Sequence, residues 1–265
     1  MPNLTSLDAL TVNTPLPLLG PHLPAFVLSV AACYAIQYAT YAFGPSLVGA
    51  GKWAQLDRRT RTESLTRTVS TVHAVIAIPC AIYALSSKTL QADPVFGYDR
   101  DVGHILAISA GYFLWDTIDS CLNSSAGFVL HGAACLVVYL CAFRPFLAGY
   151  GAPFLLWELS TPILNLYWFM DKLGTGRLHP EVINITGAIF AFTFFGARIC
   201  YGGYTSLSVF RDLWLERDQL NSFLTLNICA GCLALNGLNW MWFIKICRKF
   251  LGVRSRSTKA EGKKP

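Results

Sequence analysis

The chain has 265 residues, of which 54% are hydrophobic and only 14% are charged, and its formal net charge at pH 7 is +6. Soluble domains carry about 25% charged residues, so this composition excludes an ordinary soluble domain. Seven apolar runs approach the roughly 20 residues that a membrane-spanning helix needs, and they predict an all-α, multi-pass membrane helix bundle.

The predicted spans follow one another along nearly the whole chain. Turn-forming pairs mark several of their ends, including Gly44-Pro45, Arg144-Pro145 and Gly202-Gly203. Pro162 lies inside the fifth span and should kink it, because proline removes a helical hydrogen bond. The seven spans are residues 24–43, 67–85, 102–119, 126–143, 146–169, 182–204 and 222–244.

These spans predict four segments. Residues 1–23 precede the first span, residues 24–54 hold that span and a basic loop, residues 55–250 hold the other six spans, and residues 251–265 form a tail. Residues 1–23 lack the basic start and continuous apolar core of a cleavable signal peptide. We therefore expect them to remain as an N-terminal segment.

Positive charge is unevenly distributed along the chain. Residues 1–51 contain no lysine or arginine, the next loop holds Lys52, Arg58, Arg59 and Arg61, and residues 245–264 hold eight basic side chains. Cytosolic loops are enriched in lysine and arginine, which predicts a luminal N-terminus and a cytosolic C-terminus. The tail should meet anionic lipid headgroups, and the absence of a nucleic-acid-binding motif argues against a nucleic-acid partner.

Several polar residues interrupt the apolar spans. An ionisable group at the centre of a bilayer costs roughly 2.5–3.5 kcal/mol, so such residues mark functional sites. With the predicted orientation they share the cytosolic half of the membrane and can line one cavity. Alternatively, each polar group only bonds a neighbouring helix, and Asp119 is solvated at the interface. The predicted cavity residues are His73, Asp116, His131, Glu158 and Asn165.

Helical spacing groups some of these side chains on shared faces. Glu158, Thr161 and Asn165 are three and four residues apart, so they form one stripe. Arg198 in the sixth span has two possible roles. It either pairs with Glu158 or extends its charged end toward the luminal surface.

The polar residues of these spans, together with their neighbours, resemble the sequence pattern of a TLC domain. The resemblance rests on residues 112–119, on His131, and on residues 157–168, whose core reads Glu-x-Ser-x-Pro-x-x-Asn. It extends to His73 and to Arg198 after a phenylalanine-rich run, and it covers roughly residues 55–250. It implies a multi-pass protein of the endoplasmic reticulum that acts in lipid homeostasis, with six helices around a cavity.

Ceramide synthases are the best-understood members, and this chain departs from their pattern. They carry adjacent histidines, whereas His131 stands between Leu130 and Gly132. The resemblance thus leaves a lipid-binding protein as the first interpretation. A synthase-like transfer of an acyl group from acyl-CoA to a sphingoid-base amine is the alternative, and a seven-span receptor or transporter is the third.

The resemblance also implies roles for individual residues. If the protein is an enzyme, His131 is the candidate catalytic base and Glu158 is its electrostatic partner. Trp168 and Arg198 are two further residues that we expect to line the cavity. Histidine titrates in the range that acyl transfer needs. Acyl-CoA would be a co-substrate. No cofactor or metal is expected, because the Cys229-x-x-Cys232 pair falls within a predicted span.

Overall fold

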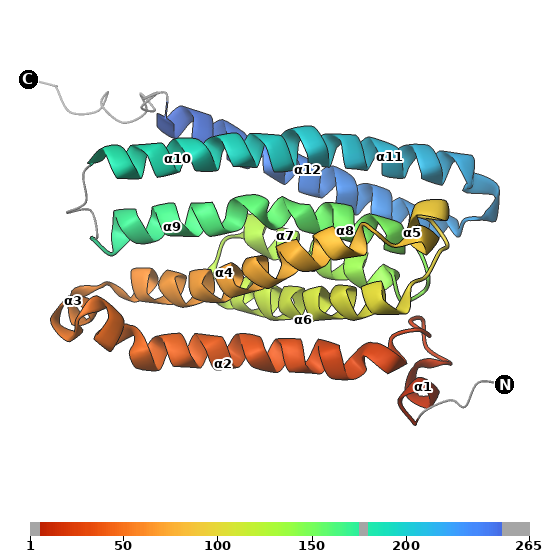
Figure 1. Cartoon of the computed structure of the whole chain (residues 1–265), viewed down its shortest axis with the longest axis horizontal. Coiled ribbons are helices and arrows are strands. Elements are labelled where there is room, and N and C mark those ends of the chain that lie inside the picture. The colour runs from red at the N-terminus through yellow and green to blue at the C-terminus, as the bar shows by residue number, and fades with distance from the viewer. Residues whose placement is uncertain (1–5, 175–179, 251–265) are drawn as a thin grey trace, which may run out of the picture.

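The computed structural model describes residues 6–174 and 180–250, and every regular element in these ranges is helical. This confirms the predicted all-α class. The long helices lie side by side along one axis in a single bundle (Figure 1). The elements are α1 (Ser6–Thr11), η1 (Gly20–His22), α2 (Leu23–Val48), α3 (Ala50–Gln55), α4 (Arg58–Ala84), α5 (Lys88–Ala92), α6 (Arg100–Asn123), α7 (Ala126–Cys141), α8 (Ala148–Leu155), η2 (Leu156–Ser160), α9 (Thr161–Lys172), α10 (Pro180–Phe194), η4 (Phe195–Tyr201), α11 (Gly202–Leu215), η5 (Arg217–Gln219) and α12 (Ser222–Phe250).

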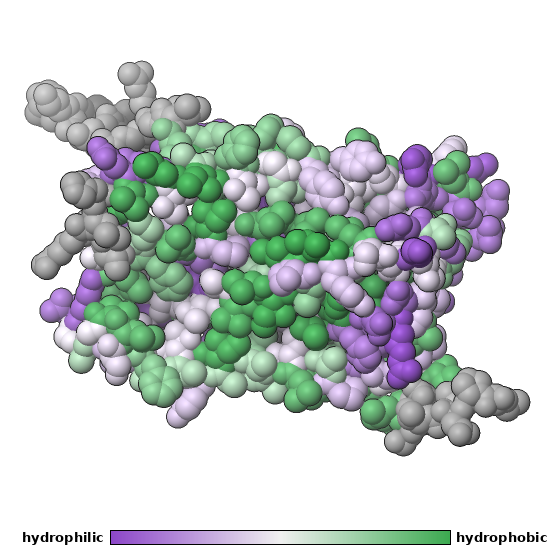
Figure 2. All heavy atoms as spheres, in the orientation of Figure 1, coloured by the Kyte–Doolittle hydropathy of each residue, from purple (hydrophilic) through white to green (hydrophobic). Residues whose placement is uncertain are grey.

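The bundle has the dimensions and surface of a membrane protein. Five helices of the described ranges are long and apolar enough to cross a bilayer, namely those at Gly20–Val48, Arg58–Ala84, Arg100–Asn123, Pro180–Leu215 and Ser222–Phe250. Hydrophobic residues cover the middle of the visible face, and hydrophilic residues gather toward its two ends (Figure 2). The chain is therefore an integral membrane protein.

The other two predicted spans are shorter or interrupted. Helix α7 has 16 residues, and the fifth predicted span consists of α8, the 3-10 turn η2 and α9 in succession. Helix α2 starts at one end of the bundle and α12 finishes at the other (Figure 1). A chain that crosses the membrane an odd number of times has its two ends on opposite sides in this way. The predicted basic tail, residues 251–265, lies outside the described residues.

The pair Gly202-Gly203 does not form the predicted turn. The helix of the sixth span continues through both glycines to Leu215. A Cβ on Gly202 would lie 2.6 Å from Nε1 of Trp157, so this glycine permits the indole to approach the backbone. Close helix contact, and not chain reversal, is the physical reason for glycine at this position.

Helix α2 is the most peripheral element and packs on α6. A Cβ on Gly111 would lie 2.5 Å from the carbonyl oxygen of Phe26, so the two backbones touch there. The Ser29 hydroxyl donates to the carbonyl of Ile108 at 2.6 Å. Hydrogen bonds and a small-residue contact therefore hold a helix that is otherwise exposed to lipid.

Side-chain hydrogen bonds cap helices that begin at the ends of the bundle. Asp99 precedes α6, and its carboxylate accepts from the amides of Asp101 and Val102 at 3.0 and 3.2 Å. The Ser87 hydroxyl donates to the same carboxylate at 2.5 Å. The Ser87 hydrogen bond, supported by the two amides, holds the pKa of Asp99 below its usual value. The ionised form of Asp99 thus stabilises the start of α6.

Replacing Asp99 with alanine should lower the free energy of unfolding by about 1 kcal/mol, as loss of an N-cap does. Because folding lowers the pKa of Asp99, its contribution is complete above the unfolded-state pKa near 4 and disappears as the pH falls through the folded-state value. Thermal unfolding in detergent between pH 6 and pH 2 would measure both effects. Asp218→Ala, at an 87% exposed side chain, is the control; equal losses in both variants would contradict the cap assignment.

Candidate functional site

A proline in the fifth span creates a break in the helix near the middle of the bundle. Pro162 stands at the start of α9, where it cannot donate the hydrogen bond that would continue the helix backward. The preceding residues form the 3-10 turn η2, which carries Glu158 and Ser160. Both side chains are buried, so the break places a carboxylate and a hydroxyl inside the bundle.

A second irregular segment faces this break. Residues Phe195–Tyr201 form the π-helical segment η4, and Arg198 lies within it. Insertions of π-helix into α-helices occur frequently at functional sites because they redirect one side chain. Here the redirected side chain is an arginine that is 6% exposed.

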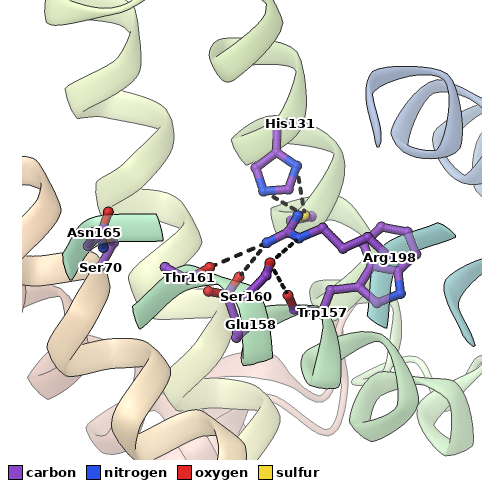
Figure 3. A network of polar contacts seen from close by, with 9 residues as sticks. Ser70, His131, Trp157, Glu158, Ser160, Thr161, Asn165 and Arg198 are labelled. Carbon is purple, nitrogen blue, oxygen red and sulfur yellow. Dashed lines mark hydrogen bonds and ion pairs between the residues drawn. The ribbon is translucent and has the colours of Figure 1, made fainter. Parts of the chain in front are cut away.

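Arg198 and Glu158 form a buried ion pair. Nη2 of Arg198 lies 3.7 Å from Oε1 of Glu158, and both side chains are 7% exposed. The guanidinium also donates to the hydroxyls of Ser160 at 3.1 Å and Thr161 at 3.4 Å (Figure 3). Arg198 therefore points into the bundle toward Glu158, which is the first of its two predicted roles, and does not extend to the luminal surface.

The ion pair borders a narrow cavity. His131 and Cys135 of α7 line the cavity together with Glu158 and Arg198, and the His131 ring faces the guanidinium (Figure 3). The space open to the centre of a water molecule is about 20 Å³, which is room for about one water. The remaining walls are apolar or aromatic, from Phe113, Val138, Tyr139, Phe154, Leu155, Trp157, Cys232 and Leu235.

Two residues that line this cavity each carry a buried polar atom without a partner among the described residues, Oε2 of Glu158 and Nε1 of Trp157. Oε2 of Glu158 is buried and makes no hydrogen bond to any described residue. A buried carboxylate oxygen without a donor is costly, because burial removes the water that would otherwise bond it. The cavity can therefore accept a ligand with a hydrogen-bond donor.

Two predicted cavity residues, Asn165 and Trp168, lie in a separate cluster between the middle of α4 and the middle of α9. Asn165 donates to Ser70 and Thr71 at 2.9 Å each, and accepts from Nη1 of Arg67 at 2.9 Å. Trp168 packs against Arg67, with the guanidinium carbon 4.8 Å from the ring centroid. These side chains join α9 to α4, and they are not among the residues that line the cavity.

His73 also lies outside the cavity. Its ring stacks on Tyr112, with centroids 3.7 Å apart and an angle of 6° between the planes. Phe113 lies at the edge of both histidine rings, with its centroid 5.9 Å from that of His73 and 6.3 Å from that of His131. The two histidines thus share a predicted depth but only His131 reaches the cavity.

The two aspartates of α6 differ from each other. Asp119 is 5% exposed and accepts from Gln37 at 3.1 Å, Thr66 at 2.7 Å and Asn123 at 3.0 Å. It therefore joins α2 and α4 to α6 and is not the solvated interfacial residue of the alternative reading. Asp116 is half-buried against Gly132, where a Cβ would lie 2.9 Å from its Oδ2, and it does not line the cavity.

Cys135 is a cavity-lining residue that the sequence analysis did not single out. Its Sγ lies 3.9 and 4.0 Å from the two ring nitrogens of His131, one helical turn earlier. The i,i+4 spacing of histidine and cysteine was the available signal. It carried little weight because cysteine is a common buried residue in apolar runs.

Comparison with known families decides the identity of this bundle. The TLC domain model matches residues 63–248, which include η2, the π-helical segment and α7. The chain belongs to the TLC domain family. The match covers most of the chain and excludes α2, so in this TLC-domain protein α2 is a helix beyond the family domain.

This TLC-domain protein is similar to proteins of two yeasts and a fish. It is 34% identical to a TLC domain-containing protein of Schizosaccharomyces pombe, over 73% of this chain and 67% of the relative. It is 30% identical to topoisomerase I damage affected protein 4 of Saccharomyces cerevisiae, over 68% and 67%. It is 32% identical to TLC domain-containing protein 4-B of Danio rerio, over 75% and 78%. No solved structure matches this chain.

Proposed function

We propose that this protein binds a membrane lipid in the cavity between α6, α7, η2, η4 and α12, and that it acts in lipid homeostasis. The observation that carries this proposal is the buried Glu158–Arg198 pair in a cavity with apolar walls. Hydrocarbon would lie against the walls, and the polar part of the lipid would meet the ion pair. Ligand sites commonly combine apolar walls with a few placed polar groups.

The cavity is too narrow for a lipid in its present form, so lipid binding requires the cavity to widen. Space for about one water cannot hold a lipid chain, so the walls must move when lipid enters. The elements that border the cavity include a 3-10 turn and a π-helical segment, both of which depart from ideal helix. We expect movement to concentrate at these two segments.

The experiment compares two buried histidines. The parent protein is purified from membranes in mild detergent, and the lipids that copurify are identified by mass spectrometry. His131→Leu should lower the amount of the bound lipid several-fold, because it removes a polar wall of the cavity. His73→Leu, which changes a buried histidine outside the cavity, should leave that lipid bound. Equal lipid content in all three proteins would contradict the proposal.

A second candidate function is acyl transfer from acyl-CoA to a lipid amine such as a sphingoid base. The presence of His131 beside Arg198 favours it, since a base and a cation are what acyl transfer requires. Loss of a general base typically costs about 10² to 10⁴ in rate. If the purified parent consumes acyl-CoA with an amine acceptor and His131→Leu does not, this function replaces simple binding.

We also propose that the protein resides in the endoplasmic reticulum with its C-terminus in the cytosol. The basic residues near α3, including Lys52 and Arg58, lie at the end of the bundle where α12 finishes (Figure 1). The basic tail would extend this charge and meet anionic lipid headgroups. A glycosylation acceptor appended after Pro265 should remain unmodified, whereas one on an extended N-terminus should be glycosylated. The reverse pattern would overturn the orientation.

A further inference from the structure

The two opposite charges that border the cavity cancel each other. Arg198 and Glu158 both line it, their charged atoms are 3.7 Å apart, and His131 adds no charge in its neutral form. An anion bound to Arg198 would compete with Glu158, and a cation bound to Glu158 would compete with Arg198. Either competition leaves one protein charge buried without its partner, which is strongly destabilising. The pair therefore favours an uncharged ligand.

The unpartnered oxygen of this pair indicates what the ligand brings. Glu158 is 6% exposed, lines the cavity, and has an Oε2 atom without a hydrogen-bond partner among the described residues. An ionised carboxylate only accepts hydrogen bonds, so the ligand must bring a donor. The space open to the centre of a water molecule is about 20 Å³. A hydroxyl is the uncharged donor of lipids that comes closest to water in size, and it can replace a water at Oε2.

A second unpartnered atom agrees with an uncharged ligand. Nε1 of Trp157 is buried without a partner in the described part of the chain, and Trp157 also lines the cavity. An indole N–H only donates, so the cavity leaves one acceptor and one donor open. A cation satisfies only the acceptor and an anion only the donor. A lipid with a hydroxyl supplies a donor, and its oxygen atoms also accept.

The depth of the ion pair in the bundle is a separate argument against a charged headgroup. In the broken fifth span, Ala148–Leu155 precede the 3-10 turn and Thr161–Lys172 follow it. At about 1.5 Å per residue, these helices separate Glu158 from the two ends of the span by about 10 Å and about 17 Å. A phosphate or ammonium headgroup would lose its hydration on the way to the pair. A hydroxyl loses much less, and it regains a hydrogen bond at Glu158.

We infer that the ligand of this cavity is an uncharged lipid alcohol, whose hydroxyl donates to Oε2 of Glu158 while its hydrocarbon lies against the apolar walls. This inference rests on the proposed function, because it names the class of lipid that the cavity binds. Diacylglycerols and sterols are two sources of this chemistry. Phospholipids and free sphingoid bases fall outside the class, because their headgroups are charged.

The test measures how tightly matched lipids bind to the full chain, delipidated in mild detergent, by native mass spectrometry. Dioleoylglycerol and cholesterol are each compared with their methyl ethers, which keep the oxygen and the hydrocarbon but lack the hydroxyl proton. The alcohol that the cavity accepts should bind about 10- to 100-fold more tightly than its ether, as loss of a hydrogen bond to a charged group predicts. Whichever alcohol shows this preference is the source. Phosphatidic acid and sphingosine should bind no better than the ethers.

Two variants test whether Glu158 makes the contact. The double variant Arg198→Met, Glu158→Leu removes both charges together, so neither remains unpaired, and it should bind alcohol and ether equally. Asp119→Asn is the matched control, because Asp119 is a buried carboxylate whose hydrogen bonds join other helices outside the cavity. It should keep the preference of the parent. Thermal unfolding of each variant establishes that it is folded, and the comparison of alcohol with ether in the parent needs no variant.

The possible failures separate this inference from the proposed function. Equal binding of alcohols and ethers by the parent overturns the hydroxyl contact, and tighter binding of phosphatidic acid or sphingosine overturns the uncharged class. Both results leave lipid binding intact, which the copurification experiment with His131→Leu tests separately. A preference for the alcohol that persists in the double variant overturns the assignment to Glu158. A parent that binds none of these lipids and retains no lipid on purification overturns both proposals.

Discussion

Arg198→Ala should destabilise the protein by about 3–5 kcal/mol, because it leaves the Glu158 carboxylate buried without its countercharge. The two side chains are each 7% exposed, and their charged atoms are 3.7 Å apart. Unfolding in detergent, followed by thermal denaturation or by a denaturant titration, would measure the loss. The double variant Arg198→Met, Glu158→Leu should lose less stability than the sum of the single changes, since neither charge remains unpaired.

An exposed ion pair provides the control for this prediction. Arg59 and Glu63 are closer, at 2.8 Å, but the arginine side chain is 87% exposed and the pair lies at the start of α4. Arg59→Ala should cost at most about 0.5 kcal/mol, because water screens the charges. If Arg198→Ala were no more destabilising than Arg59→Ala, the buried pair would have no structural role and its energetic assignment would be wrong.

Asn165→Leu should destabilise the protein by about 3 kcal/mol, which corresponds to leaving two or three polar groups without partners. Asn165 is 2% exposed and bonds Ser70, Thr71 and Arg67 of α4. Leucine has a similar volume, so the loss would come from hydrogen bonds and not from a void.

The matched comparison is Leu166→Ala on the next position of α9. That side chain is 54% exposed and lies on a face directed away from α4, so its truncation should cost less than about 1 kcal/mol. The same unfolding measurement applies to both variants. A cost below 1 kcal/mol for Asn165→Leu would show that the cluster does not hold α9 to α4.

The positions of the membrane helices could be predicted from the sequence. Each span needs about 20 apolar residues, and the lipid environment requires the backbone to be helical across it. The predicted spans accordingly coincide with helices, and Pro162 interrupts the fifth span as expected. Their ends are less accurate, because α4 already begins at Arg58 and α2 continues through the predicted turn Gly44-Pro45 to Val48. The end of the sixth span was misplaced because Gly202 permits close packing against Trp157 and does not end the helix.

The composition of the site could be predicted only in part. His131, Glu158 and Arg198 come together, whereas His73 and Asn165 lie in other clusters. The sequence predicts their shared depth in the membrane. It does not predict the direction in which each side chain points, because a span that is apolar on every side gives no periodic signal for its buried face.

The sequence by itself determined that this protein is a bundle of membrane helices and that it carries the TLC motif. The tertiary structure decided which of those residues meet. A 3-10 turn at Glu158 and a π-helical segment at Arg198 rotate two side chains toward each other, and the packing of α7 places His131 and Cys135 beside them. Pro162 marks the first break in the sequence, but which side chains meet depends on contacts between helices distant in the chain, so no local pattern encodes the pairing.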